Sequence, residues 1–191
     1  MPKLRQVLGS LAILVLGGSL LSPGTPVHAA PKASPGQWFI ESYGIDKAWE
    51  RTTGKGVKVA IIDSGVKGDH ENLTGKVVGA KDFSGSKTDG QTPVGPKDTV
   101  RHGTAVAGVI AGNGTNLGPR GVAPDAELLS ASMWLGSGGP ADAPSSRQQA
   151  ADAIKWSVDN GAKVINMSLG WADPAWPEYW DEAFSYAYEK D

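Results

Sequence analysis

Hydrophobic positions follow the period of β-strands in four segments of the chain. The clearest is VKVAIID at 57–63, which is β-branched, almost continuously apolar and bounded by glycine and serine turn residues. Such a run is typical of a strand buried on both faces. Further strands are predicted after a turn within 70–85, in AELLSASMW at 126–134 and in AKVINMSLG at 162–170.

Another segment, RHGTAVAGVIAG at 101–112, repeats small residues at a four-residue spacing. This spacing predicts a helix, because residues four apart share one face of a helix. His102 opens the predicted helix, and its small face is formed by Gly103, Ala107 and Ala111. We expect this face to pack closely on its neighbours.

Two later segments also show helical periodicity. The segment 145–161 ends on an Asn-Gly pair, which is a common stop signal for a helix. The segment 177–191 begins with proline, which suits the start of a helix. One face of this last helix carries three aromatic residues, Trp180, Phe184 and Tyr188.

Strands and helices therefore alternate along the chain, after an amphipathic segment at 37–56. We predict an α/β fold in which a mostly parallel sheet carries helices on both faces. In such folds, ligands bind beyond the carboxyl ends of the strands. Candidate functional residues are expected where strands end.

The first 29 residues have the pattern of a secretory signal peptide. Lys3 and Arg5 precede an apolar stretch at about 7–21, and Val27-His28-Ala29 resembles a cleavage site. A membrane anchor is the alternative, but the apolar stretch is short and broken by three glycines. We therefore expect a secreted, extracellular protein that meets the membrane only through its export signal.

Composition narrows the classes of function. The chain of 191 residues has a formal net charge of −2, which becomes −4 when Lys3 and Arg5 are removed. This balance does not favour a nucleic-acid partner. The chain contains no cysteine, which excludes disulfides, cysteine-bound metals and a thiol nucleophile.

Candidate chemistry gathers where the predicted strands end. Asp63 ends the first strand, His102 opens a helix after a polar loop, and Ser168-Leu169-Gly170 ends the fourth strand. An aspartate on a buried strand is costly unless it is paired. We expect Asp63 to accept a hydrogen bond from one nitrogen of His102, which leaves the other nitrogen free to take a proton. The simpler alternatives are a turn-capping aspartate and a helix-terminal histidine.

Four motifs carry a resemblance to a known family. In chain order they are VAIIDSGV, HGTAVAGVIAG, GVAPDAELL and VINMSLG. They resemble the motifs of the subtilisin-like serine proteases, and the resemblance covers roughly 38–191. The signal peptide and the stretch TTGKGVKVAIIDSGV also resemble exported actinobacterial members, including the mycosins. The resemblance implies a leader and lead-in segment at 30–52 and a subtilisin-like peptidase domain, N-terminal portion, at 53–191.

The resemblance implies a secreted serine endopeptidase with an Asp-His-Ser triad. Asp63 would orient and stabilise the imidazole, and His102 would act as general base and then general acid. Two segments would pair with an extended polypeptide substrate like added strands. They are Gly136-Ser137-Gly138 and Ser168-Leu169-Gly170.

Two motifs of this family are missing from the 191 residues. They are the Gly-Thr-Ser-Met-Ala-like stretch that holds the nucleophile and the Ala-Ala-Gly-Asn-like stretch that supplies the oxyanion-hole asparagine. Both normally lie beyond the position of Asp191. We therefore expect an incomplete catalytic domain that is inactive by itself.

The sequence also bears on metal sites and on other classes of function. No cofactor is expected to be required. The loop at 113–121 and Asn72 match a calcium-binding region of the family, but their side-chain amides predict at most a weak site. A metallohydrolase using Asp63, Asp69, His70 and His102 is one alternative, although the His-Glu-x-x-His spacing is absent. A non-catalytic, exported peptide-binding module is the other.

Overall fold

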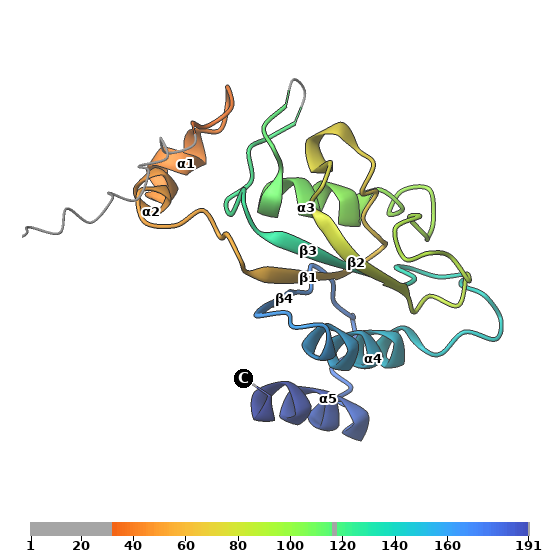
Figure 1. The fold of residues 1–191 in the computed structure, drawn as a ribbon. Helices are drawn as coiled ribbons and strands as arrows, with labels where there is room; N and C mark the ends of the chain where they lie inside the picture. The colour runs from red at the N-terminus through yellow and green to blue at the C-terminus, as the bar shows by residue number, and fades with distance from the viewer. Residues whose placement is uncertain (1–31, 116–117, 191) are drawn as a thin grey trace, which may run out of the picture.

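The computed structural model describes residues 32–115 and 118–190 (Figure 1). The predicted signal peptide at 1–29 lies outside the described residues. None of the helices within the described residues is long and apolar enough to cross a membrane. The elements are α1 (Trp38–Ser42), α2 (Ile45–Trp49), β1 (Lys58–Asp63), η1 (Glu71–Leu73), β2 (Val77–Asp82), α3 (His102–Ala111), β3 (Glu127–Ser132), α4 (Ser146–Asp159), β4 (Val164–Asn166) and α5 (Glu178–Glu189).

Four parallel strands form one sheet in the order β2-β3-β1-β4. The register between the two central strands pairs Lys58 with Glu127 and Asp63 with Ser132. All of β1 except its first residue is buried, as the apolar run in the sequence predicts. The predicted α/β fold is therefore confirmed.

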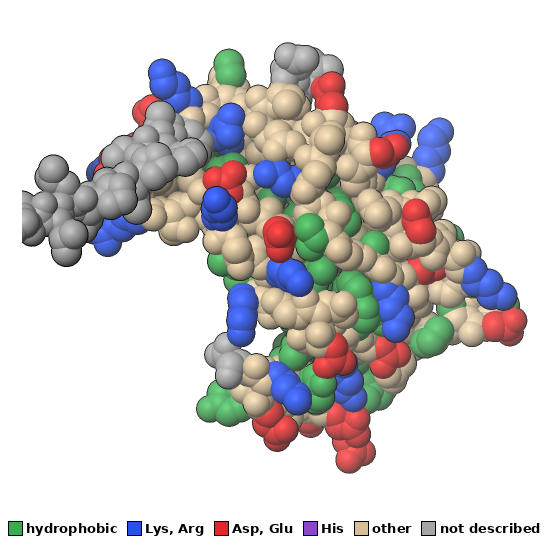
Figure 2. All heavy atoms as spheres, viewed as in Figure 1, with side chains coloured by type: hydrophobic (Ala, Val, Ile, Leu, Met, Phe, Trp, Pro, Cys, Tyr) green, Lys and Arg blue, Asp and Glu red, His purple; other side chains and the backbone are tan. Residues whose placement is uncertain are grey.

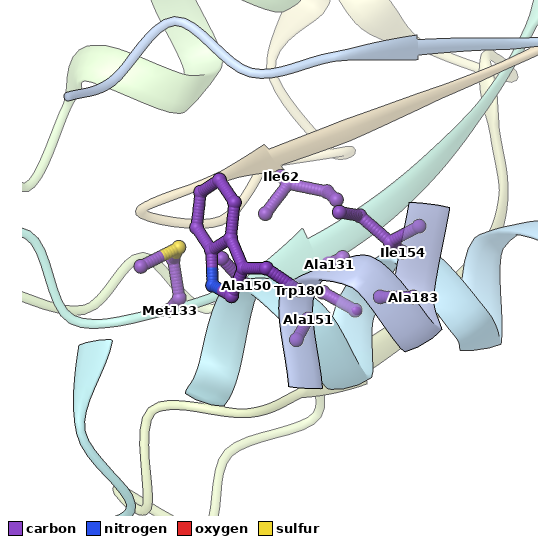
Figure 3. Packing of buried hydrophobic residues seen from close by; sticks show 9 residues of the cluster. Ile62, Ala131, Met133, Ala150, Ala151, Ile154, Trp180 and Ala183 are labelled. Atoms are coloured by element: carbon purple, nitrogen blue, oxygen red, sulfur yellow. The ribbon is translucent and has the colours of Figure 1, made fainter. Parts of the chain in front are cut away.

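Helices cover both faces of the sheet. Figure 1 shows α3 on one face and α4 on the other, with α5 packed against the outer side of α4. Side chains of β1 alternate between these layers, because successive residues of a strand point to opposite faces. Ile61 belongs to the apolar cluster beneath α3, and Ile62 belongs to the cluster beneath α4. Figure 3 shows Ile62 with the buried side chains of α4 and α5.

Two details differ from the sequence prediction. The paired part of the fourth strand is only Val164–Asn166, although 162–170 has strand-like composition. The aromatic face of α5 is also only partly buried. Trp180 is buried, but Phe184 is 41% exposed and Tyr188 is 86% exposed. The small side chain of Ala183 is buried in their place, since α5 packs directly on another helix and close approach needs a small residue.

Charged side chains of both signs are interspersed on the surface. Figure 2 shows Lys and Arg alternating with Asp and Glu over the face that it presents. This arrangement agrees with the small net charge of −2.

Candidate active site

Asp63 and His102 meet at the carboxyl end of the sheet. Nδ1 of His102 lies 2.9 Å from Oδ2 and 3.0 Å from Oδ1 of Asp63, which confirms the predicted hydrogen bond. The Asp63 side chain is fully buried, whereas that of His102 is 45% exposed. A buried carboxylate that accepts from Nδ1–H fixes the tautomer in which Nε2 is free to accept a proton.

The geometry follows from how β1 ends and α3 begins. Asp63 is the last residue of β1, and its Oδ1 also accepts a hydrogen bond of 2.7 Å from the backbone N–H of Ser64. His102 is the first residue of α3, so its side chain lies at the carboxyl end of the sheet, next to Asp63. The long loop between β2 and α3 returns the chain to the end of β1, where the backbone N–H of Val94 bonds to Ser64 O at 2.7 Å.

Gly103 allows this close approach of helix and strand. A Cβ at this position would lie 2.6 Å from the carbonyl oxygen of Gly65 and 3.1 Å from Oδ1 of Asp63. Contacts of 2.6 Å to backbone cannot be relieved by a side-chain movement alone. The small residue next to His102 is therefore required by the distance between α3 and β1.

We predict that Gly103→Ala lowers the free energy of unfolding by about 1–3 kcal/mol, because the added methyl overpacks the junction. Gly108→Ala is the matched control. It is a buried glycine of the same helix, yet the nearest atom to an added Cβ is 3.8 Å away. Alanine favours helix over glycine by about 1 kcal/mol, so the control should be neutral or stabilising. Urea denaturation followed by circular dichroism measures both, and equal effects of the two substitutions would contradict this account.

A second carboxylate, Asp82, lies at the same edge of the sheet. Burial by itself raises the pKa of Asp82, but hydrogen bonds from Ser84, Thr88 and Ser132 together outweigh it and lower the pKa below its ordinary value. The distances are 2.6 Å from the Ser84 hydroxyl, 2.8 Å from Thr88 N and 3.0 Å from the Ser132 hydroxyl. Asp82 therefore stays ionised near neutral pH and ties the loop after β2 to the end of β3.

An open pocket of about 460 Å³ lies beside His102. Four of the six predicted substrate-binding residues line it, namely Gly136, Ser168, Leu169 and Gly170. Ser137 and Gly138 do not line it and are exposed on the neighbouring turn. The carbonyl oxygen of Ser137 accepts a hydrogen bond of 3.0 Å from Nε1 of Trp134.

Two tryptophans, Trp134 and Trp171, belong to the pocket wall, and the sequence reasoning missed Trp134. The backbone N–H of Trp134 donates to Gln149 Oε1 on α4 at 2.8 Å. The indole N–H of Trp171 donates to Ser146 Oγ at 2.8 Å, and the guanidinium of Arg147 lies 5.1 Å from the Trp171 ring. One signal was available for Trp134, since it follows β3 by two residues at the edge where Asp63 lies. Further lining residues are Thr99, Met133, Leu135, Ser146 and Ala172.

A family comparison agrees with this geometry. The sequence model of the subtilase family matches residues 54–191. The chain belongs to the subtilase family. The resemblance to subtilisin-like proteases found in the sequence is thereby confirmed.

The relatives that this subtilase matches are much longer proteins. It is 37% identical over 164 residues to a calcium-dependent protease of Trichormus variabilis, covering 79% of this chain and 22% of that protein. It is 36% identical over 141 residues to thermitase of Thermoactinomyces vulgaris, covering 73% of this chain and 47% of that protein. The solved structure of the MycP3 protease from the type VII (ESX-3) secretion system matches with a TM-score of 0.60 and 32% identity, over 88% of this chain and 46% of that one. The subtilase chain thus spans less than half the length of each.

Ser168 is one of two serines that line the pocket in this subtilase, and the other is Ser146, whose hydroxyl accepts the hydrogen bond from Trp171. Its hydroxyl accepts a hydrogen bond of 2.9 Å from Nδ2 of Asn166, two residues earlier in the chain. Within 32–115 and 118–190, no hydrogen bond joins a serine side chain to the His102 ring. Ser168 therefore lines the same pocket as His102 without a hydrogen bond to it.

Asn72 is hydrogen-bonded to the described part of the loop at 113–121, which the family resemblance matches to a calcium-binding region. Oδ1 of Asn72 already accepts hydrogen bonds from Gly114 N at 2.8 Å and Thr115 N at 3.1 Å, while its Nδ2 donates to Pro119 O at 3.0 Å. The side-chain oxygen of Asn72 is thus used by the loop itself, so this amide is a poor calcium ligand in the arrangement seen.

The metallohydrolase alternative requires a cluster of ligands. In the parts of the chain that the structure describes, no three His, Cys, Asp or Glu side chains come together in this way. Asp69 pairs with Lys67 at 2.9 Å, and His70 Nδ1 accepts from Asn72 N at 3.2 Å. The candidates Asp69 and His70 are therefore occupied in local contacts away from the Asp63–His102 pair.

Proposed function

We propose that this subtilase chain supplies the acid–base machinery of a serine endopeptidase. The observation that carries the proposal is the Asp63–His102 pair, in which a fully buried carboxylate holds Nδ1 at 2.9 Å and the half-exposed imidazole borders an open pocket. Acyl transfer by a hydroxyl nucleophile needs a base that is held in one tautomer in this way. The family of the chain supports the same reaction.

His102 performs two proton transfers in the proposed mechanism. Its Nε2 takes the proton from a serine hydroxyl as that oxygen attacks the peptide carbonyl, and then returns the proton to the departing amine. Asp63 stabilises the imidazolium that forms between the two transfers. The attacking serine is not assigned to any residue of this chain, because no Gly-Thr-Ser-Met-Ala-like motif occurs in it.

The proposed substrates are extended polypeptide segments. Gly136 and Ser168-Leu169-Gly170 line the pocket, and their backbone groups can pair with a substrate in the manner of added strands. Main-chain pairing accepts many sequences, so unfolded or loop segments of proteins are the substrate class. We also propose export through residues 1–29, on the pattern of their sequence. No step of the proposal uses calcium.

A fluorophosphonate probe tests the assignment, because it labels only a serine that a neighbouring base activates. We expect no labelling of the purified 191-residue chain, since Ser168 is bonded to Asn166 and not to His102. If the gene encodes further residues, its whole product should be labelled at a serine beyond Asp191, and His102→Ala should abolish that labelling. Stoichiometric labelling of Ser168 that depends on His102 would overturn the role given to this strand end.

A peptide-binding module without catalysis is the second candidate. It is favoured by the absence of a serine bonded to His102 among the described residues. Binding of a labelled unfolded polypeptide, measured by fluorescence anisotropy, would then be unaffected by His102→Ala, and the whole gene product would not react with the probe.

A further inference from the structure

The helix that carries His102 begins without a cap of its own. Its N-cap residue is Arg101, whose side chain makes no capping hydrogen bond. The first N–H groups of a helix have no partner within the helix and must find one elsewhere. For the N–H of Gly103 this partner is the hydroxyl of Ser64, at 3.1 Å, which comes from the loop after β1.

Ser64 is fully buried, and each of its polar groups is used near the catalytic pair. Its backbone N–H donates to Oδ1 of Asp63 at 2.7 Å. Its hydroxyl donates to the carbonyl oxygen of Val100 at 3.2 Å while accepting from Gly103 N. A single residue therefore contacts the catalytic carboxylate and the backbone on both sides of His102.

We propose that Ser64 is a positioning residue for the Asp63–His102 pair. The Ser64 hydroxyl is hydrogen-bonded to Val100, two residues before His102, and to Gly103, one residue after it. The histidine therefore cannot shift relative to Asp63 without breaking one of these bonds. The inference rests on the proposed roles of Asp63 and His102, and it adds that their distance is set by a third side chain. A second bond, from Lys67 N to Thr104 Oγ1 at 3.0 Å, holds the same turn of α3 but does not involve the carboxylate.

A matched control is available on the neighbouring strand. Ser130 is also fully buried, and its hydroxyl likewise links two backbone groups. It accepts from Val66 N at 2.9 Å and donates to Gly90 O at 2.6 Å. Removing either hydroxyl removes two hydrogen bonds to backbone groups. Of the two serines, however, only Ser64 is hydrogen-bonded to α3.

The test follows the Nδ1–H proton of His102 by NMR in the full chain labelled with ¹⁵N-histidine. A proton held between Nδ1 and a buried carboxylate resonates far downfield and exchanges slowly with water. We expect Ser64→Ala to speed its exchange about tenfold or to remove the signal, since the ring then samples positions away from Asp63. Ser64→Thr keeps the hydroxyl and should restore slow exchange. Ser130→Ala should lower the melting temperature comparably and leave the signal unchanged.

The outcomes separate this inference from the proposed function. A wild-type signal that persists equally in folded Ser64→Ala and Ser130→Ala would refute the positioning role and leave the proposed function intact. No such signal in the wild type, or a signal that survives Asp63→Asn, would refute the Asp63–His102 bond on which both rest. Should Ser64→Ala not fold, Ser64→Cys takes its place, because a thiol bonds weakly at similar size. An exchange rate equal to that of the wild type in Ser64→Cys would then count against the inference.

Discussion

Replacing His102 by alanine should lower kcat for peptide hydrolysis by about a millionfold in a protein that joins this chain to the nucleophilic serine. That magnitude is the one known for subtilisin and is taken over by family membership. Without the imidazole, no group removes the proton of the serine hydroxyl during attack. Asp63→Asn should lower kcat by about 10⁴-fold, because the histidine remains but loses its correct tautomer.

The kinetic test uses a fluorogenic peptide under saturating and limiting substrate. KM should change little, since His102 contributes only a wall to the pocket. His70→Ala is the matched control, because the Nδ1 of His70 accepts a local hydrogen bond from Asn72 N at 3.2 Å and the residue does not line the pocket. Its kcat should stay near that of the wild type. A His102→Ala enzyme that keeps more than about one hundredth of wild-type kcat would rule out the proposed base.

The sequence alone predicted those parts of the site that depend on the residue pattern within one strand or one helix. The apolar run of β1 requires burial on both faces, so an aspartate at its end has to be paired. The small residues of α3 require close packing, and this places the first residue of the helix at the sheet edge. The two patterns together predict the contact between Asp63 and His102, which the structure shows at 2.9 Å.

The pocket walls could not be predicted in the same way, because they depend on contacts between distant segments. Trp134 is fixed by Gln149 of α4, 15 residues away, and Trp171 by Ser146, 25 residues away. The role of Ser64 also depends on the position of α3, which lies 39 residues on from the strand end. Periodicity reports which face of one element is apolar, but not which partner that face meets.

The α5 helix illustrates the same limit. Its aromatic spacing marks Trp180, Phe184 and Tyr188 as one face, but only Trp180 is buried. The indole N–H of Trp180 donates to the carbonyl oxygen of Arg147 at 3.0 Å. Trp180 and Ala183 are buried together with side chains of α4, and Phe184 and Tyr188 are left more exposed.

The burial of Trp180 leads to the largest stability effect that we predict. Its ring is 8% exposed and meets Trp171 edge-on, with 5.1 Å between the centroids. Figure 3 shows it in the cluster that joins α4 and α5 to the sheet. Trp180→Ala should therefore lower the free energy of unfolding by about 3–5 kcal/mol through the cavity that it leaves. For a domain of this size the melting temperature should fall by roughly 10 °C.

The same substitution should also reach the active site, because Trp171 lines the pocket beside His102 and loses its neighbour when Trp180 is removed. Affinity for an unfolded polypeptide, measured by fluorescence anisotropy well below the melting temperature, should fall in Trp180→Ala. Trp38→Ala is the control, since Trp38 is 71% exposed and outside the pocket, and truncating it should change stability by less than about 1 kcal/mol. Melting temperatures are measured by circular dichroism. An equal decrease in the two variants would show that the aromatic cluster does not hold α5 in place. Weaker binding by Trp180→Ala than by Trp38→Ala at equal folded fraction would instead connect the core beneath α4 to the proposed substrate pocket.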